Sequence, residues 1–203
     1  MLISQLNSSV QQSLEHIRNL VQAIHPLTET EWQGLERIWT PVNYKRKEIL
    51  TRAGEKEKHL YFVLEGIQRV VYYDEKGREA TIVFTYPYSF GGVLDALMQQ
   101  TPSMYFYETL SPSSFLRAPF FKLEELMYIH ANINTMIRKG ITAALSGVLE
   151  RLTELQCFSS EEKFRKLLQR SPHILQMIPH KYLANYLGID PSNFSKLINS
   201  VRI

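Results

Sequence analysis

Apolar residues near both ends of the chain recur every three or four positions, the spacing of an amphipathic helix. This pattern predicts a helix over residues 4–24. A second helix is expected over residues 29–38, because Thr28 stands three positions before Glu31, as in a capping box. Helical spacing returns further along, over residues 122–129, 133–155 and 161–170, and in a final pair of short helices within residues 180–199.

The middle of the chain has a different pattern. Its apolar runs are short, rich in β-branched and aromatic residues, and separated by turn residues. Seven strands are expected, over residues 40–44, 49–52, 59–65, 68–73, 80–86, 104–110 and 114–118. Strands this short and closely spaced are typical of a sandwich or barrel, so the chain is predicted to be of the α+β class.

The pair of short helices near the C-terminus has the pattern of a helix-turn-helix. Gly188 can adopt the left-handed conformation that ends a helix, Asp190 is a good N-cap, and Pro191 suits a first helical position. The second helix then presents an outward face of short polar side chains able to contact base edges and phosphates: Ser192, Asn193, Ser195, Lys196 and Asn199. The alternative is a helical hairpin with a solvated polar face.

Charge is unevenly distributed along the chain, although the formal net charge is only +3. Residues 158–203 hold seven Lys or Arg against three acids, and the remainder holds 16 against 17, so the C-terminal quarter carries +4 and the rest −1. This balance suits a nucleic-acid-binding module on a neutral body, or it is a chance excess in a short window.

The long helix over residues 133–155 has more apolar face than a small barrel can cover, which favours self-association over packing within its own domain. The residues expected in that interface are Ile137, Ile141, Ala144, Leu145, Val148 and Leu152.

Other classes of site are not expected. The single cysteine, Cys157, excludes a disulfide within the chain and a thiolate cluster, and indicates a reducing cytoplasm. We find no signal peptide and no apolar stretch approaching 18 residues, so no membrane span is expected. The histidines have no metal-ligand spacing, and no catalytic motif is present, so an enzyme is not expected. We interpret His59 and His130 as surface or structural residues.

These residues together resemble the Crp/Fnr regulators, the bacterial cyclic-AMP receptor protein and its relatives, from about Leu27 to Ile203. The resemblance is carried by Ala53-Gly54-Glu55, by residues 61–66 with Arg69, by the turn at 74–79, by Phe90-Gly91 and by Thr101-Pro102. It implies a jelly-roll sensor domain over residues 1–130, a dimerisation helix over 131–157 and a DNA-binding helix-turn-helix domain over 158–203. The implied partners are a second copy of the chain, palindromic double-stranded DNA and RNA polymerase.

The ligand site departs from the pattern of the cyclic-nucleotide binders in this family. In those proteins the segment that holds the ligand, the cassette, would correspond to the region of Phe90-Gly91 and Thr101-Pro102. They place a glutamate after the glycine that opens the cassette and an arginine after its Thr-Pro. Here Gly91 is followed by Gly92, and Thr101-Pro102 by Ser103. Cyclic AMP binding in the usual mode is therefore not expected, because a buried phosphate needs a cationic or multi-donor partner. The candidate pocket for a different effector is formed by Phe90, Gly91, Gly92, Val93, Leu94, Ser103, Met104 and Tyr105.

The expected function is that of a dimeric DNA-binding regulator without a resident cofactor. Ser192, Asn193 and Lys196 are the candidates for bases or adjacent phosphates. The candidates for backbone contacts are Lys181, Ser195, Asn199 and Arg202. The alternative, from another class, is a ligand-binding or protein-interaction module whose helix-turn-helix is vestigial.

Overall fold

The fold is described here from a computed structural model of the chain, covering residues 2–201, with side chains from residue 11 onward. Two helices open the chain: α1 (Leu2–Ile24) and α2 (Glu29–Glu36). The strands and the short helix between them are β1 (Thr40–Tyr44), β2 (Ile49–Thr51), β3 (His59–Glu65), β4 (Gln68–Tyr73), β5 (Glu79–Thr85), β6 (Phe90–Gly91), α3 (Leu94–Gln99), β7 (Phe106–Thr109) and β8 (Ser113–Pro119). The remaining helices are α4 (Phe120–Ile129), α5 (Ala131–Cys157), α6 (Ser160–Arg170), α7 (Ile174–Met177), α8 (His180–Leu187) and α9 (Pro191–Ser200).

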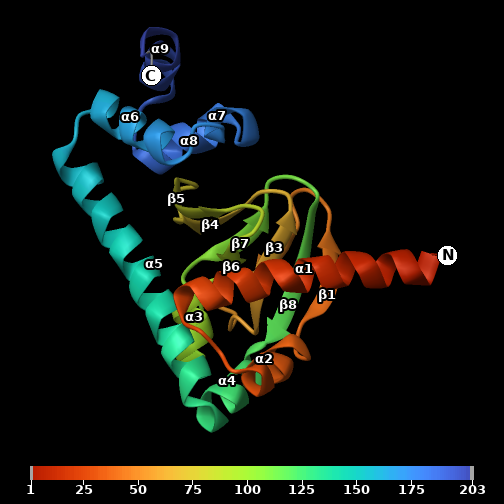
Figure 1. Cartoon of the computed structure of the whole chain (residues 1–203). Coiled ribbons are helices and arrows are strands. Elements are labelled where there is room, and N and C mark those ends of the chain that lie inside the picture. Colours follow the sequence, from red (N-terminus) through yellow and green to blue (C-terminus); the bar gives the residue numbers. More distant parts are fainter. Residues whose placement is uncertain (1, 202–203) are drawn as a thin grey trace.

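The strands form two antiparallel sheets of four that face each other as a jelly-roll-like β-roll (Figure 1). One sheet has the order β1-β8-β3-β6 and the other the order β2-β7-β4-β5. Between them lies a core of Tyr61, Val63, Val70, Tyr107 and Phe115. Both β5 and β2 are edge strands, so no strand of the sheet pairs with β5 along one of its sides.

A second core lies on the outer face of the first sheet, where the helices α1, α2 and α4 and the beginning of α5 pack against it. Its members include Trp32, Leu35, Phe62, Leu116 and Leu123. The capping box that starts α2 is present, because the side chain of Thr28 accepts from the Glu31 amide and the Glu31 carboxylate accepts from the Thr28 amide.

Helix α5 runs past the roll and leads to the C-terminal helices α6 to α9, which gather at its far end (Figure 1). These helices have their own core, which includes Phe164, Leu167, Leu183, Leu187 and Phe194. That core continues into the roll through Phe84 on β5.

The helices and strands expected from the sequence are present, with ends that differ by a few residues. Three short elements were not expected: β6, α3 and α7. The strand expected over 104–110 begins only at Phe106, because the Ser103 side chain turns the chain by accepting from the Tyr105 amide and donating to its carbonyl. Within residues 2–201, no helix is long and apolar enough to cross a membrane.

Candidate functional site

The turn between α8 and α9 is built as the sequence indicates. Gly188 has a φ of +59°, in the left-handed region where a side chain is unfavourable. The Asp190 carboxylate accepts hydrogen bonds from the amides of Ser192 at 2.8 Å and Asn193 at 3.4 Å. The hydroxyl of Ser192 also donates to it, and this bond is the main reason that the pKa of Asp190 lies below its usual value. Helix α9 therefore begins at a fixed place and direction.

The inner face of α9 is held by aromatic and aliphatic packing. Phe194 and Leu197 are buried, and the Phe194 ring meets the Phe164 ring edge-on at 5.4 Å. Ala184 is buried against this pair, so a small residue stands where the two helices approach. The outer face of α9 is consequently directed away from the protein.

All five polar residues expected on that outer face are exposed: Ser192, Asn193, Ser195, Lys196 and Asn199. Three of them are engaged locally, since Ser192 donates to Asp190, Ser195 to the Pro191 carbonyl and Asn199 to the Ser195 carbonyl. The side chains of Asn193 and Lys196 form no hydrogen bond or ion pair within residues 11–201. They are the two members of this face that are free for an external partner.

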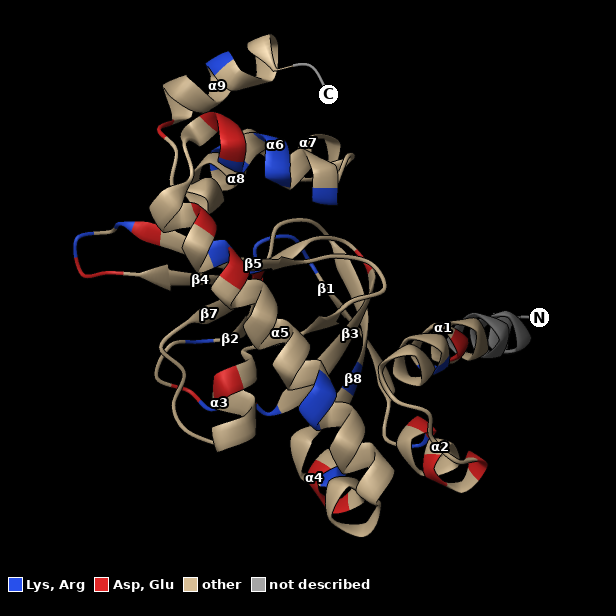
Figure 2. Cartoon of the chain, turned by 60° about the vertical axis from the view of Figure 1, so that its left-hand side comes forward, with Lys and Arg blue, Asp and Glu red and all other residues tan. Residues whose placement is uncertain are grey.

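The basic residues of the C-terminal helices are distributed over α6, α8 and α9 (Figure 2). Lys181, on α8, is exposed, and its ammonium lies 4.6 Å from the centre of the Tyr182 ring. Arg170 is held by Glu154 at 2.7 Å and is therefore a structural contact. Arg202, the remaining candidate from the sequence, lies outside the described residues.

Helix α8 is attached to the edge of the roll by the side chain of one asparagine. The Asn185 amide group donates to the Glu79 carbonyl and accepts from the Thr81 amide, each at 2.7 Å. Beside it the Tyr186 ring packs on Phe84 at 5.1 Å and lies 3.3 Å from the Arg151 guanidinium. The C-terminal helices are thereby oriented against β5.

Beneath this contact, a buried arginine joins the roll to α8. Arg69 is 2% exposed, forms ion pairs with Glu79 and Glu108 at 2.8 Å each, and lies 4.2 Å from the Tyr182 ring. Burial opposes the charge, yet the hydrogen bonds that Arg69 donates to these carboxylates hold its pKa above the usual value. Neither Asn185 nor Arg69 was among the candidate site residues from the sequence. The signal for Arg69 is that an arginine is unusual within a β-forming run.

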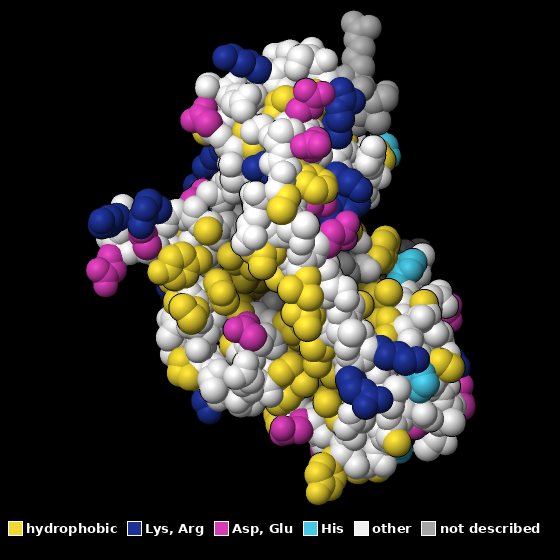
Figure 3. Space-filling view, turned by 90° about the vertical axis from the view of Figure 1, so that its left-hand side faces the viewer, with side chains coloured by type: hydrophobic (Ala, Val, Ile, Leu, Met, Phe, Trp, Pro, Cys, Tyr) yellow, Lys and Arg dark blue, Asp and Glu magenta, His cyan; other side chains and the backbone are white. Residues whose placement is uncertain are grey.

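The apolar stripe of α5 is largely exposed from residue 142 onward. Leu145, Val148 and Leu152 are each about half exposed, and Leu149, which the sequence analysis did not select, is equally so. Ile137 is an exception, because it is partly buried and packs on the chain's own core with residues of α1 and α4. Figure 3 shows the hydrophobic side chains running along α5 and into a hollow beside the roll.

That hollow is an apolar groove of about 840 Å³ between α5, α3 and the sheet that contains β5. Of the eight pocket residues predicted from the sequence, four line it: Gly92, Val93, Leu94 and Tyr105. The other four do not. Phe90 packs on Trp39 and Phe62 outside the roll, Gly91 and Ser103 are buried in the protein, and Met104 is 66% exposed.

The space between the two sheets beside this groove is filled by aromatic side chains. Tyr61, Tyr107 and Phe115 are almost fully buried, and the Tyr61 ring lies 5.6 Å from Tyr107 and 5.4 Å from Phe115. The Tyr107 hydroxyl is hydrogen-bonded to Thr85, and a Cβ on Gly91 would collide with it. Glycine at position 91 thus serves close packing in this chain.

Comparison with known proteins agrees with this architecture. Residues 41–130 match the family model described as the cyclic nucleotide-binding domain. No match was found among the curated protein sequences.

Solved structures resemble the chain over most of its length. FixK2 of Bradyrhizobium japonicum is 16% identical, with a TM-score of 0.72 over 80% of this chain and 83% of that one. A Crp/Fnr-family protein of Eubacterium rectale is 16% identical, with a TM-score of 0.67 over 85% and 82%. The catabolite activator protein of Thermus thermophilus is 18% identical, with a TM-score of 0.54 over 87% and 84%. The resemblance to the Crp/Fnr regulators is confirmed at the level of the fold.

Proposed function

We propose that this chain is a homodimeric, DNA-binding transcription regulator whose sensor domain does not take cyclic AMP in the usual mode. Residues 1–130 would form the sensor domain, residues 131–157 the dimer helix and residues 158–203 the DNA-binding domain. RNA polymerase is the further partner that such a regulator would address.

The observation that carries this proposal is the outer face of α9. The helix lies at the end of the molecule farthest from the roll (Figure 1), its start is fixed by Asp190, and its inner face is buried through Phe194. Asn193 and Lys196 are left free on the outer face. An amide group can pair with a base edge, and an ammonium can pair with a phosphate or a guanine.

Dimerisation through α5 is supported by the spacing of its apolar residues. Ile141, Leu145, Val148, Leu152 and Leu155 follow one another at intervals of four, three, four and three. This spacing is that of a coiled-coil seam, and the single chain leaves the large side chains at the last four of these positions exposed. A symmetric pair of α9 helices would then read half-sites about 34 Å apart.

The departure from the usual nucleotide mode is supported by the roll itself. Gly92 and Ser103 stand where cyclic-nucleotide binders carry the glutamate and the arginine. Tyr61 and Tyr107 fill the space between the sheets beside the groove, and the two arginines that line the groove, Arg151 and Arg170, come from α5 and α6 and not from the cassette. A cyclic nucleotide bound in the usual mode would therefore lack the cassette's own positive charge beside its phosphate.

Selection from a pool of random duplexes, at two salt concentrations, tests the DNA-binding proposal. A palindromic consensus with half-sites one helical turn apart is the expected result. Lys196→Ala should weaken binding and lower the salt slope by about 0.9 if the ammonium neutralises one phosphate. Lys122→Ala, at an exposed position on α4, is the matched control and should leave both unchanged.

The second candidate function is a ligand-binding or protein-interaction module with a vestigial helix-turn-helix. It is favoured by the presence of only one basic residue, Lys196, between Asp190 and Asn199. If no duplex is retained even at low salt, this second function replaces the first.

A further inference from the structure

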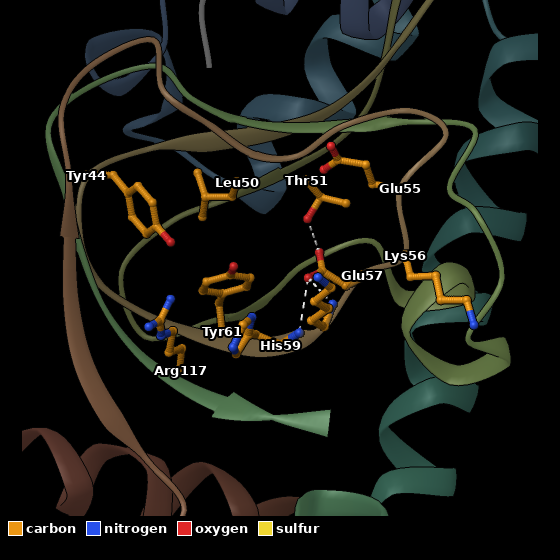
Figure 4. A pocket seen from close by; sticks show the side chains of 10 residues that line it. Tyr44, Leu50, Thr51, Glu55, Lys56, Glu57, His59, Tyr61 and Arg117 are labelled. Atoms are coloured by element: carbon orange, nitrogen blue, oxygen red, sulfur yellow. Dashed lines mark hydrogen bonds between the residues drawn. The ribbon is translucent and has the colours of Figure 1, made fainter. Parts of the chain in front are cut away.

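A second cavity opens at one end of the roll, on the side away from α5 (Figure 4). It has a volume of about 470 Å³ and lies between the two sheets, lined by β1, β2, β3, β8 and the loop that leads into β3. It shares no lining residue with the groove beside α5. Its size lies within the range of small-molecule sites, roughly 300–1,000 Å³.

An arginine and two tyrosines face one another across this cavity. Arg117 on β8 stands directly opposite Tyr61 on β3, so both side chains are on the inner face of the sheet. Tyr44, at the end of β1, packs edge-on against Phe115 and turns its hydroxyl inward. Leu50 on β2 completes the apolar wall.

The guanidinium of Arg117 is half-buried and has no partner among the side chains of residues 11–201. By contrast, the guanidinium of Arg69 on β4 donates to two carboxylates and two hydroxyls. Partly buried guanidinium groups are normally paired, because burial removes the water that would otherwise solvate the charge. Arg117 is therefore a cation that lacks its anion.

The groups around Arg117 do not supply that anion. Burial lowers the pKa of His59, and the positive charges of Arg117 and Lys58 lower it further. Lys56 and Glu55 also line the mouth of the cavity and have opposite charges. The environment of Arg117 is thus positive on balance.

The one deep carboxylate, that of Glu57, is already committed to the protein. One of its oxygens accepts from the amides of Lys58 and His59, and the other accepts from the Thr51 hydroxyl and the Val93 amide. Burial raises the pKa of Glu57, which reduces the negative charge it can offer. It forms the back wall of the cavity and leaves Arg117 unpaired.

We propose that this cavity binds a small organic carboxylate with a flat apolar body. The carboxylate would pair with the Arg117 guanidinium, whose planar fork matches its two oxygens, and would accept from the Tyr44 hydroxyl. The flat body would lie against the Tyr61 ring and Leu50. This site is independent of the proposed DNA binding.

Benzoate is the probe that tests the site, and benzamide is its neutral isostere. Calorimetric titration of the full chain should detect benzoate binding at a single site, with benzamide weaker by about tenfold or more. Arg117→Gln should weaken benzoate to the level of benzamide. Arg37→Gln, at an exposed position after α2, should bind benzoate like the wild type.

Proton NMR of His59 gives a second readout that loss of structure would not mimic. Bound benzoate places a negative charge beside the ring, so the His59 pKa should rise on saturation. A His59→Gln variant identifies the resonance. Benzamide should leave the His59 pKa unchanged.

Three results would overturn the proposal: no benzoate binding at millimolar concentration, equal binding of benzamide and benzoate, or undiminished benzoate binding by Arg117→Gln. The comparison of benzoate with benzamide uses the wild-type protein alone, so it decides the question even if the Arg117 variant fails to fold. Tyr44→Phe keeps the ring and removes the hydroxyl, and should reduce benzoate affinity severalfold without affecting benzamide.

Discussion

Replacement of Asn185 by alanine should release α8 from the edge of the roll. The two hydrogen bonds of this side chain are made to consecutive outward-facing groups of β5, the Glu79 carbonyl and the Thr81 amide. A carboxamide can satisfy such a pair because it offers one donor and one acceptor side by side. Alanine offers neither, and the edge of β5 loses its partner.

The cost follows from the geometry of these bonds. Each is 2.7 Å long and partly buried, and a hydrogen bond of this kind contributes about 0.5–1.5 kcal/mol net. The Thr81 amide, in a residue 3% exposed, would be left without its partner while the helix stays docked. A loss of about 2 kcal/mol from the two hydrogen bonds together lowers the equilibrium constant for docking of α8 on β5 on the order of 30-fold.

Amide hydrogen exchange measures this change directly. In Asn185→Ala, the Thr81 amide should exchange on the order of 30-fold faster than in the wild type, whereas amides in β3 and β8 should be unaffected. Asn134→Ala is the control, because Asn134 is an exposed asparagine on α5 whose side chain makes no hydrogen bond to residues 11–201.

The reasoning fails if Thr81 keeps its wild-type protection in Asn185→Ala. In that case the contacts of Tyr186 with Phe84 and Arg151 would hold α8 in place by themselves. Acceleration in every strand together would also contradict it, since that pattern indicates global destabilisation of the roll.

Three further changes test other parts of the molecule. Leu152→Glu, which alters a side chain 48% exposed on α5, should leave the fold intact and convert the dimer to a monomer in sedimentation equilibrium; an unchanged mass would remove α5 from the interface. Phe194→Ala should cost about 3–5 kcal/mol in the core of the C-terminal helices and abolish duplex retention, and full retention would contradict the role of α9. The folded-state pKa of Glu57 is raised, so the folded chain binds an extra proton above about pH 4.5. The free energy of unfolding, relative to that of Glu57→Gln, should therefore fall as pH rises through the folded-state pKa. Free energies from urea unfolding that change in parallel with pH for the two proteins would refute this.

The sequence predicts those parts of the molecule that are determined by neighbouring residues. The capping box at Thr28 and the N-cap at Asp190 each depend on groups within three positions, and both are present. The outward positions Asn193 and Lys196 followed from helical spacing, and both are exposed. The strand signals predicted only a sandwich or barrel, and the jelly-roll arrangement came from the family resemblance.

Contacts between distant segments were not predictable in this way. Strand β6 has only two residues, and it exists because it pairs with Tyr61 and Phe62 on β3. Its cassette neighbours were expected to line one pocket, yet Phe90 packs outside the roll and Gly91 is buried against Tyr107. The attachment of α8 by Asn185 joins residues more than one hundred positions apart.

Arg69 and Arg117 illustrate why the composition of a strand does not reveal its function. Each stands within a β-forming run. The sequence alone does not show what surrounds either side chain, so it could place neither arginine in a site. The fold gives Arg69 two carboxylates and buries it, which makes it part of the contact between the roll and α8. The same fold directs Arg117 into a cavity lined by tyrosines, where no carboxylate of residues 11–201 forms an ion pair with it. Since a half-buried cation is costly when unpaired, a structural role accounts for Arg69 and leaves Arg117 unexplained until an external anion completes it.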